Sequence, residues 1–588
     1  MTNAQGLRTH RLRSEWLIRR SCRRLALAVC FSLLVGACGS GGDDGNSGGD
    51  GVTPPPPAPP TSSLKIEGTA ATGAPIVAAP VEVKCAAGTG AGTTGADGTY
   101  SVDIAAASLP CVLRVAPVGS AALHSLATGT GATVRANLTP VTELIVASLV
   151  GGVPAEWFSS FDGAAASRVT GDAVSSASAA VLSILRAAGL DFGAGVDPIG
   201  AAFTAAAGDP YDAALVRLSG ALTSSGTTLP DLTRAVAASS AGASSTVVAL
   251  PPDRLLQPAA ASCAAMRSGT YRIVSPTPSA NLGSQTSTLV FDAGAMSVSR
   301  SDGSTGTWTA NGECRFTDQG SNYTAEVVVS QAGVIVGRMT RGGVSRDFIG
   351  FAEQAHAVDK LAGTWNTLGL EWSGTAFFAT SGTVTFDAGG RIVSGTDCTD
   401  PATWSIRNCV VVPDSIVALF PPITSDASGG FAFVEGGAAT SRLFAYRAGS
   451  GDFMLIAVSM EGNFSLYVAD RPVVPQAVGT TSTSWGFDSN ASYLAQSAIG
   501  EGGNTVTASD STSWTRLQTA ANGVQYSNTL LANNPRQGYV HRDAGTTTGS
   551  NGLPYNFIQL DWLRTYGMGV TPVLLTTQRV FQWSVVRP

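Results

Sequence analysis

The stretch Phe291-Asp292-Ala293-Gly294 returns later in the chain as Phe386-Asp387-Ala388-Gly389. A Gly-Thr-aromatic triplet precedes each copy, at Gly269-Thr270-Tyr271 and at Gly363-Thr364-Trp365. Each copy is followed by a valine, an aspartate and a cysteine at the same offsets from its phenylalanine: Val298, Asp302 and Cys314 in the first, and Val393, Asp397 and Cys409 in the second. A tryptophan, Trp308 or Trp404, also follows in each copy. Self-similarity of this kind is typical of duplicated structural units. The copies predict two consecutive β-modules, over residues 263–356 and 357–474.

Apolar and polar residues alternate in short runs around the first motif, which predicts seven or eight antiparallel strands. These runs cover residues 270–273, 288–291, 296–298, 307–309, 323–329, 334–339 and 347–351. Strands of that number tend to close into a barrel or to fold into a sandwich, because both arrangements remove exposed edges. Asp292 and Asp387 could be read as an acid pair, but we interpret them as hairpin-turn residues.

A fainter third copy, without a cysteine, predicts a degenerate β-module over residues 475–588. It comprises Ile499, Gly502-Gly503, Val506, Asp510 and Trp514. The Gly-x-Trp opening at Gly363-Thr364-Trp365 resembles the first strand of lipocalins and avidins, which are ligand-holding barrels. That resemblance implies a carrier of a small apolar ligand, whereas a tryptophan that only fills one end of a barrel explains the same residues.

Residues 64–120 also alternate and predict half-buried strands near 64–67, 81–84, 100–104 and 112–115. The spacing of Gly73-Ala74-Pro75-Ile76, the next strand and the turn Asp97-Gly98-Thr99-Tyr100 resembles the carboxypeptidase regulatory-like domain, a small prealbumin-like β-sandwich. That resemblance implies a structural or carbohydrate-binding-like accessory module.

Residues 136–240 predict a small helical domain, followed by a linker over 241–262. Thr139 is placed to cap a helix that has Pro140 at its first position. A second helix has apolar residues at helical spacing and ends near Gly189, and a third starts at Asp209-Pro210. Such stripes indicate a core, with a ligand groove as the alternative. They comprise Val174, Ala177, Val181 and Leu185 in one helix and Tyr211, Leu215, Leu218 and Leu222 in the other.

The start of the chain has the parts of an export signal. Arginines lead into an uncharged apolar run from Leu25 to Val35, which is too short for a membrane anchor of roughly 20 residues. Val35-Gly36-Ala37-Cys38 resembles the lipobox of bacterial lipoproteins, which implies removal of residues 1–37 and lipidation of Cys38. Gly39 resembles the second residue of lipoproteins that go on to the outer membrane. The alternative is an ordinary cleaved signal with an incidental cysteine.

Residues 38–63 are rich in Gly, Asp, Ser and Pro and predict a disordered tether. The remaining six cysteines, an even number in an exported chain, predict disulfides. The modules place these cysteines two by two, so we expect the pairs Cys85–Cys111, Cys263–Cys314 and Cys398–Cys409. A metal site is the alternative, but the chain has no Cys-x-x-Cys or histidine at ligand spacing.

Removal of residues 1–37 takes away seven arginines and one glutamate, so the net charge falls from −6 to about −12. This charge argues against nucleic acid as a partner. Charged residues make up only 13% of the chain, which suits short strands and polar turns better than long charged helices. We therefore expect a multidomain, mainly β protein whose modules fold independently.

The sequence has no zinc-protease helix, serine elbow or phosphate-binding loop, and it predicts no cofactor. We expect a lipid-anchored, non-enzymatic protein of the outer membrane that binds a glycan, a peptide or an envelope protein. Candidate ligand contacts, which would serve equally well as core residues, are Trp308, Trp404, Trp514 and Trp583. A hydrolase of extracellular polymer is the alternative, and a serine and a carboxylate beside His356 or His541 would favour it.

Overall fold

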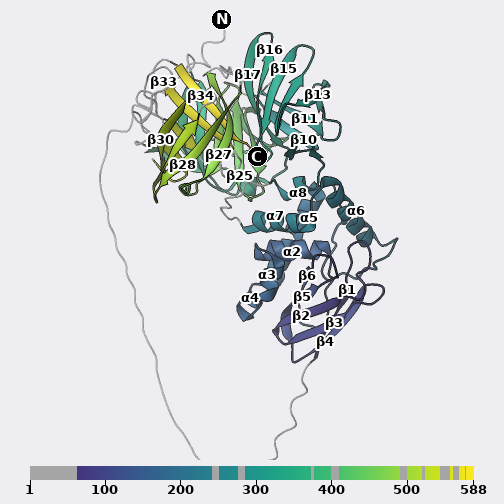
Figure 1. The fold of residues 1–588 in the computed structure, drawn as a ribbon. Helices are drawn as coiled ribbons and strands as arrows, with labels where there is room; N and C mark the ends of the chain where they lie inside the picture. The colour runs from purple at the N-terminus through teal and green to yellow at the C-terminus, as the bar shows by residue number, and fades with distance from the viewer. Residues whose placement is uncertain are drawn as a thin grey trace, which may run out of the picture. The chain divides into compact units, whose positions relative to one another are not determined.

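The structure, a computed structural model, places the elements of a mainly β chain in the order in which the sequence predicts them (Figure 1). Two small sheets come first, then a run of helices, then three β-modules. The described residues are 63–241, 250–275, 282, 285–372, 377–398, 409–490, 499–519, 523–534, 536–542, 557–560, 568–575 and 578–587. The export signal, Cys38 and the tether lie outside them.

The first seven strands form two sheets, with orders β4-β1-β7 and β3-β2-β5-β6. Buried and exposed residues alternate strictly along β4, as expected for a strand with one face in the core. Strands β6 and β7 lie beyond residue 120, where we expected the sandwich to end; β6 pairs with β5 and β7 with β1, so the sheets continue to Arg135. The strands are β1 (Ser63–Thr69), β2 (Pro80–Ala87), β3 (Thr89–Thr93), β4 (Thr99–Ala105), β5 (Ser108–Val115), β6 (Leu123–Ala127) and β7 (Thr133–Arg135).

The helices begin where the capping signals predict. Thr139 caps α2 by accepting the backbone N–H of Thr142, and Asp209 caps α6. All four apolar residues predicted for the face of α5 are buried, and Gly189 follows the end of this helix with a positive φ of 84°. The helices are α2 (Pro140–Val150), α3 (Pro154–Ser159), α4 (Gly163–Ser167), α5 (Gly171–Ala187), α6 (Pro210–Ser225), α7 (Leu229–Ala241) and α8 (Pro252–Leu255).

Helix α2 joins the helices to the sheets. Its residues are buried from Pro140 to Ala147, and Leu144 shares a core with Val112 of β5 and Leu126 of β6. All five residues of β6 are buried because one face of this strand meets its own sandwich and the other meets the helices. The core of the helical region therefore includes residues of the sheets.

The first β-module is a closed eight-stranded barrel in which β17 pairs back with β10. The alternation found seven of its strands and missed β14, whose sequence Arg-Phe-Thr-Asp-Gln has a single apolar residue. A short pair, β8 (Ala259–Ala260) and β9 (Cys263–Arg267), precedes the barrel. The barrel strands are β10 (Gly269–Val274), β11 (Thr286–Asp292), β12 (Ser297–Arg300), β13 (Thr305–Ala310), β14 (Arg315–Gln319), β15 (Tyr323–Val329), β16 (Ile335–Arg341) and β17 (Val344–Ala352).

The second module repeats this topology in a nine-stranded sheet. Its first strand pairs with its last. Phe386 is the last residue of its second strand, and Phe291 is the last but one of the second strand in the first barrel. Across the described residues the sheet is open between β21 and β22. Its elements are η2 (Val358–Leu361), β18 (Gly363–Trp372), β19 (Phe377–Phe386), β20 (Ile392–Asp397), β21 (Val410–Val411), α9 (Asp414–Val417), β22 (Thr424–Ser425), β23 (Phe431–Glu435), β24 (Ala438–Arg447), β25 (Phe453–Ser459) and β26 (Phe464–Ala469).

The third module is again a closed eight-stranded barrel, but the predicted alignment of its motif is wrong by one strand. Val506 lies in the second strand of its barrel, whereas Val298 lies in the third. Likewise Trp514 lies in a third strand and Trp308 in a fourth. The strands are β27 (Thr481–Asn490), β28 (Gly500–Ser509), β29 (Ser513–Thr519), β30 (Gln525–Ala532), β31 (Tyr539–Arg542), β32 (Phe557–Leu560), β33 (Met568–Leu575) and β34 (Gln578–Val586).

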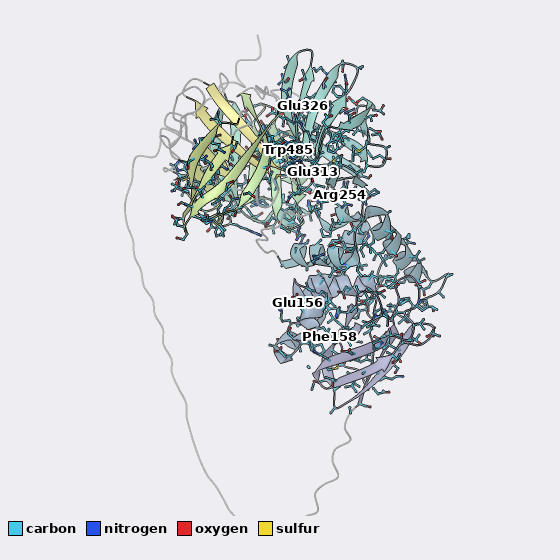
Figure 2. The ribbon with its side chains drawn as sticks, in the orientation of Figure 1. Glu156, Phe158, Arg254, Glu313, Glu326 and Trp485 are labelled. Carbon is cyan, nitrogen blue, oxygen red and sulfur yellow. A yellow bond between two sulfur atoms is a disulfide. The ribbon has the colours of Figure 1, made fainter. Side chains whose placement is uncertain are left out.

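The three β-modules pack on one another around one hydrophobic core, and the independent folding of each module stays a prediction. This core contains Val336 and Ile349 of the first barrel, Ile456 of the second module, and Trp485 and Val585 of the third (Figure 2 labels Trp485). The rings of Phe464 and Trp583, from the second and third modules, lie 6.0 Å apart. Outer faces of the sheets are therefore buried against one another.

Candidate functional site in the third barrel

The tryptophans expected as ligand contacts are core residues. Trp308, Trp514 and Trp583 are 3%, 6% and 1% exposed, and Trp404 lies outside the described residues. Trp308 packs inside the first barrel, with its ring 5.3 Å from that of Phe291 and 5.5 Å from that of Phe316. Buried rings cannot form an outward platform, and a role of these tryptophans as ligand contacts stays a prediction.

The cysteines pair as the sequence analysis expects. Cys85–Cys111, Cys263–Cys314 and Cys398–Cys409 have S–S distances of 2.03, 1.95 and 2.04 Å. The first pair joins register partners of β2 and β5, and the second ties β9 to the residue before β14. The third joins the residue after β20 to the residue before β21. Each bridge lies within one sheet region or module.

The structure brings together one histidine and one carboxylate that the sequence analysis did not connect. The Nδ1 atom of His124 in β6 lies 2.7 Å from Oε2 of Glu143 in α2, and the same oxygen accepts the backbone N–H of His124 at 2.7 Å. These side chains are 1% and 9% exposed, and the ring of Phe158, which Figure 2 labels, lies 5.7 Å from the imidazole. Because both partners are enclosed, the pair fastens α2 to β6.

His356, the histidine whose neighbours would have favoured a hydrolase, bonds an amide. Its Nε2 atom lies 3.0 Å from Oε1 of Gln354, and its ring meets Phe453 edge-on at 4.8 Å. Burial, together with the charge of Arg447, lowers the pKa of His356 to about 4. The imidazole is therefore neutral at neutral pH, and among the described residues no serine and carboxylate are bonded to it. His541, in β31, is 6% exposed.

The inner face of the third barrel is polar along β28, β29 and β30. Register pairs place Asn504 opposite Gln518, and Arg516 opposite Asn528. Arg516 Nε donates to Asn528 Oδ1 at 2.9 Å, and Asn528 Nδ2 donates to Gln518 Oε1 at 3.2 Å. Asn528 is 2% exposed. Because side chains alternate between the two faces of a strand, the exposed Thr505 and Ser527 belong to the outer face.

One end of this polar face is closed by an apolar cluster, which contains Val506, Trp514, Leu530, Ala532 and Val540 from the barrel together with Val473 from the preceding connection. Val473 is held there by Asn533, whose Oδ1 accepts its backbone N–H at 2.7 Å and whose Nδ2 donates to its carbonyl at 2.9 Å. Two buried polar atoms, Oδ1 of Asn504 and Nε1 of Trp514, have no hydrogen-bond partner among the described residues. Each therefore lacks a bond that a buried polar atom normally makes.

The inner face of the first barrel is mainly apolar, unlike the polar face of the third barrel. Its inner face carries Phe291, Val298, Trp308, Phe316 and Val327, all at most 3% exposed, and an ion pair between Arg300 and Asp318 lies beside them. An eight-stranded barrel is just wide enough to be filled by side chains or to hold one small ligand. The first barrel is filled by its own aromatic rings, and the third barrel is the candidate site.

Sequence reasoning missed Asn504, Arg516, Gln518 and Asn528 because it looked for aromatic contacts. The sequence signal that could have identified these residues was their position along the predicted strands. They stand at alternate places along three strands, where the inner face of a barrel usually carries apolar residues.

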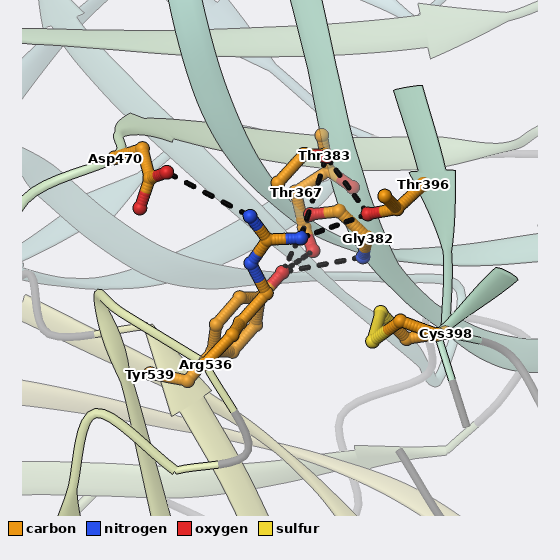
Figure 3. The surroundings of a disulfide bond; sticks show 9 residues. Thr367, Gly382, Thr383, Thr396, Cys398, Asp470, Arg536 and Tyr539 are labelled. Carbon is orange, nitrogen blue, oxygen red and sulfur yellow. Dashed lines mark hydrogen bonds and ion pairs between the residues drawn. A yellow bond between two sulfur atoms is a disulfide. The ribbon is translucent and has the colours of Figure 1, made fainter. Parts of the chain in front are cut away.

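The third barrel meets the second module through a polar junction (Figure 3). The Tyr539 hydroxyl lies 2.7 Å from the Thr367 carbonyl oxygen and 2.8 Å from the Gly382 carbonyl oxygen. Arg536 Nη1 donates to Thr396 Oγ1 at 2.9 Å, and its Nη2 atom lies 3.7 Å from Oδ2 of Asp470. Burial raises the pKa of Tyr539, so the phenol stays protonated. The junction holds the barrel against β18, β19 and β20.

Within the described ranges, no cluster of three or more His, Cys, Asp or Glu side chains could hold a metal ion. None of the described helices combines the length and apolar character needed to cross a membrane. The fold and site define a disulfide-bonded, mainly β protein of several modules, one of which is a barrel with a polar inner face.

Neither a known protein family nor a curated protein matches the chain. Among solved structures, isotype 1 transferrin binding protein B from serogroup B Neisseria meningitidis is similar over 51% of this chain and 65% of its own length, with 10% identity and a TM-score of 0.18. Intact Ap-TbpB (N and C lobes) is similar over 54% of this chain and 76% of its own, with 8% identity and a TM-score of 0.13. The chain thus spans about 65% of the first of these proteins. Similarity at these TM-scores carries no argument about function.

Proposed function

We propose that this protein is a lipid-anchored lipoprotein of the outer membrane that binds a ligand with its β-modules. The observation that carries the anchor is the order of Val35-Gly36-Ala37-Cys38, a Gly- and Pro-rich segment, and then folded modules with three disulfides. Disulfides persist in oxidising compartments, which supports export. Several acyl chains on one cysteine anchor stably, whereas a single chain binds only marginally.

The binding role is supported by the third barrel, whose inner face presents amide and guanidinium groups along β28, β29 and β30. The described inner face of β28, β29 and β30 is polar, and the inner face of the first barrel is occupied by its own apolar side chains, so the described part of neither barrel favours the carrier of an apolar molecule. The net charge of about −12 that follows signal removal also disfavours nucleic acid as the partner.

The anchor is tested with Cys38→Ser in the native host, beside the wild type and a control variant, Ser40→Ala, in the adjoining segment. Cells are labelled with radioactive palmitate and fractionated into soluble, inner-membrane and outer-membrane material. We expect labelled wild type and Ser40→Ala in the outer membrane, and unlabelled Cys38→Ser in the soluble fraction. Label on Cys38→Ser, or its retention in the outer membrane, would contradict the proposal.

A further inference from the structure

The first barrel carries arginines at one end of its inner face, which we call its mouth. Arg300 is the last residue of β12, Arg341 is the last of β16, and Arg346 is near the start of β17. Alternate residues of a strand share a face, so Arg300 lies on the same side as the buried Val298. By the same rule Arg346 lies on the same side as the buried Phe348.

A tyrosine ring at the mouth brings two of these arginines together. Tyr323 is the register partner of Arg341, and the guanidinium carbon of Arg341 lies 5.9 Å from the centre of its ring. The guanidinium carbon of Arg300 lies 5.2 Å from the centre of the same ring. Arg346 is the diagonal neighbour of Arg341 across the β16–β17 hairpin, a separation of about 7–8 Å that long side chains bridge. The three arginines can therefore contact one small molecule.

One of the three arginines is neutralised and two are not. Arg300 forms an ion pair with Asp318, which also accepts a hydrogen bond from the Tyr323 hydroxyl at 3.2 Å. Arg341 and Arg346 have no carboxylate partner among the residues that the structure describes. Arg341 is exposed and Arg346 is half-buried, so solvent reaches both. A ligand at the mouth meets two unpaired cations.

The strand connections at the mouth add little negative charge. They comprise residues 275–285, 301–304, 320–322 and 342–343. Their sequences contain one charged residue, Asp302, whose carboxylate accepts hydrogen bonds from the backbone and the hydroxyl of Ser304. With Asp318 included, two carboxylates face three guanidinium groups, whereas the chain without residues 1–37 has a net charge of about −12. This local excess of positive charge attracts anions.

From this arrangement we infer that the mouth of the first barrel binds a small ligand through an oxyanion, a carboxylate or a phosphate, held by Arg341 and Arg346. A guanidinium group donates two parallel hydrogen bonds to either anion. Val344, which is opposite Arg341 and 46% exposed, offers an apolar contact to the rest of the ligand. Aromatic side chains fill the barrel below, so the ligand lies at the mouth and not inside. This inference rests on the proposed binding function and deepens it by naming a ligand class and a place.

The test is calorimetric titration of purified full-length protein with galacturonate and with inorganic phosphate. Galactose is the neutral probe, and phosphatidylglycerol vesicles present phosphate on a lipid surface. Arg341→Gln and Arg346→Gln each remove one unpaired cation. Arg391→Gln, at an exposed arginine of the second module, is the matched control because it makes the same change of charge. Near-UV circular dichroism and thermal melting check that each variant is folded.

We expect saturable binding of galacturonate or phosphate, weakened about tenfold by Arg341→Gln and by Arg346→Gln and unchanged by Arg391→Gln, since each loss removes hydrogen bonds to a charged group. Binding should also weaken as the salt concentration rises, because both arginines are reached by solvent.

The inference would be overturned by equal affinity in all folded variants, by galactose binding as tight as galacturonate binding, by binding of vesicles alone, or by binding of no probe. If one arginine variant fails to fold, the other decides. The titration does not depend on the lipid anchor, so it can fail while the Cys38 test succeeds, and the reverse.

Discussion

The indole N–H of Trp583 donates to Oδ2 of Asp347 at 2.7 Å, and this bond joins the last strand of the third barrel to the last strand of the first. Asp347 is fully buried and Trp583 is 1% exposed. A carboxylate removed from water needs hydrogen bonds to offset its lost hydration. The two barrels are thus coupled through a bond that neither forms alone.

Trp583→Phe should lower the free energy of unfolding by about 1–3 kcal/mol more than Trp308→Phe does, because only the first substitution takes a donor away from a buried carboxylate. The comparison is matched, since both sites are at most 3% exposed and Nε1 of Trp308 has no described hydrogen-bond partner. Urea unfolding followed by circular dichroism measures both losses. Equal losses would show that the Trp583–Asp347 bond does not couple the barrels.

Glu143→Ala should destabilise the protein by about 2–4 kcal/mol, because the backbone N–H and Nδ1 of His124 both lose their shared partner inside the core. Glu156→Ala, at an exposed glutamate of α3, serves as the control and should change stability by less than about 0.5 kcal/mol (Figure 2). Thermal unfolding gives the two values. If the Glu143→Ala variant were as stable as the Glu156→Ala variant, the proposal that this pair holds α2 against β6 would be contradicted.

His356 should make stability fall as the pH falls. Its pKa is lowered from 6.5 to about 4 in the folded protein, so the unfolded chain takes up the proton first on acidification. The stabilising effect of the neutral imidazole is complete above pH 6.5 and is lost as the pH falls toward 4. The loss amounts to at most about 3 kcal/mol. Urea unfolding measured between pH 4 and pH 6.5 should show that the free energy of unfolding depends less on pH in His356→Gln than in the wild type. Parallel plots of unfolding free energy against pH for the two proteins would refute the prediction.

Removing the Cys263–Cys314 bridge by a double serine substitution should cost about 4 kcal/mol, against about 3 kcal/mol for Cys398–Cys409. The difference follows from sequence separations of 51 and 11 residues, since the longer closed loop restricts the unfolded chain more. Denaturant midpoints of the two double variants, measured under one set of conditions, provide the comparison. A larger loss for Cys398–Cys409 would argue against an effect that acts through the unfolded state.

Local patterns predicted the elements well wherever one face of a strand or helix is buried. The cap at Thr139, the buried stripe from Val174 to Leu185 and the equivalence of Phe291 with Phe386 all depend on residues close in sequence. The polarity of β14 hid this strand, because Asp318 is buried through its ion pair with Arg300 and not through apolar character.

The contacts between modules could not be predicted in the same way. His124 and Glu143, or Trp583 and Asp347, meet only because sheets and helices pack on each other's outer faces. The candidate site was missed for a related reason. Asn504 and Gln518 have the polarity of surface residues, and only the closure of the barrel places them inside.

The common core of the three β-modules has a consequence for the order in which the chain can mature. Trp583 and Val585 of β34 cover surfaces of modules that leave the ribosome much earlier. Until β34 has been synthesised, hydrophobic surfaces on the earlier modules stay exposed to water and to other nascent chains. We therefore expect maturation to be completed late, with a helper protein shielding those patches in the meantime.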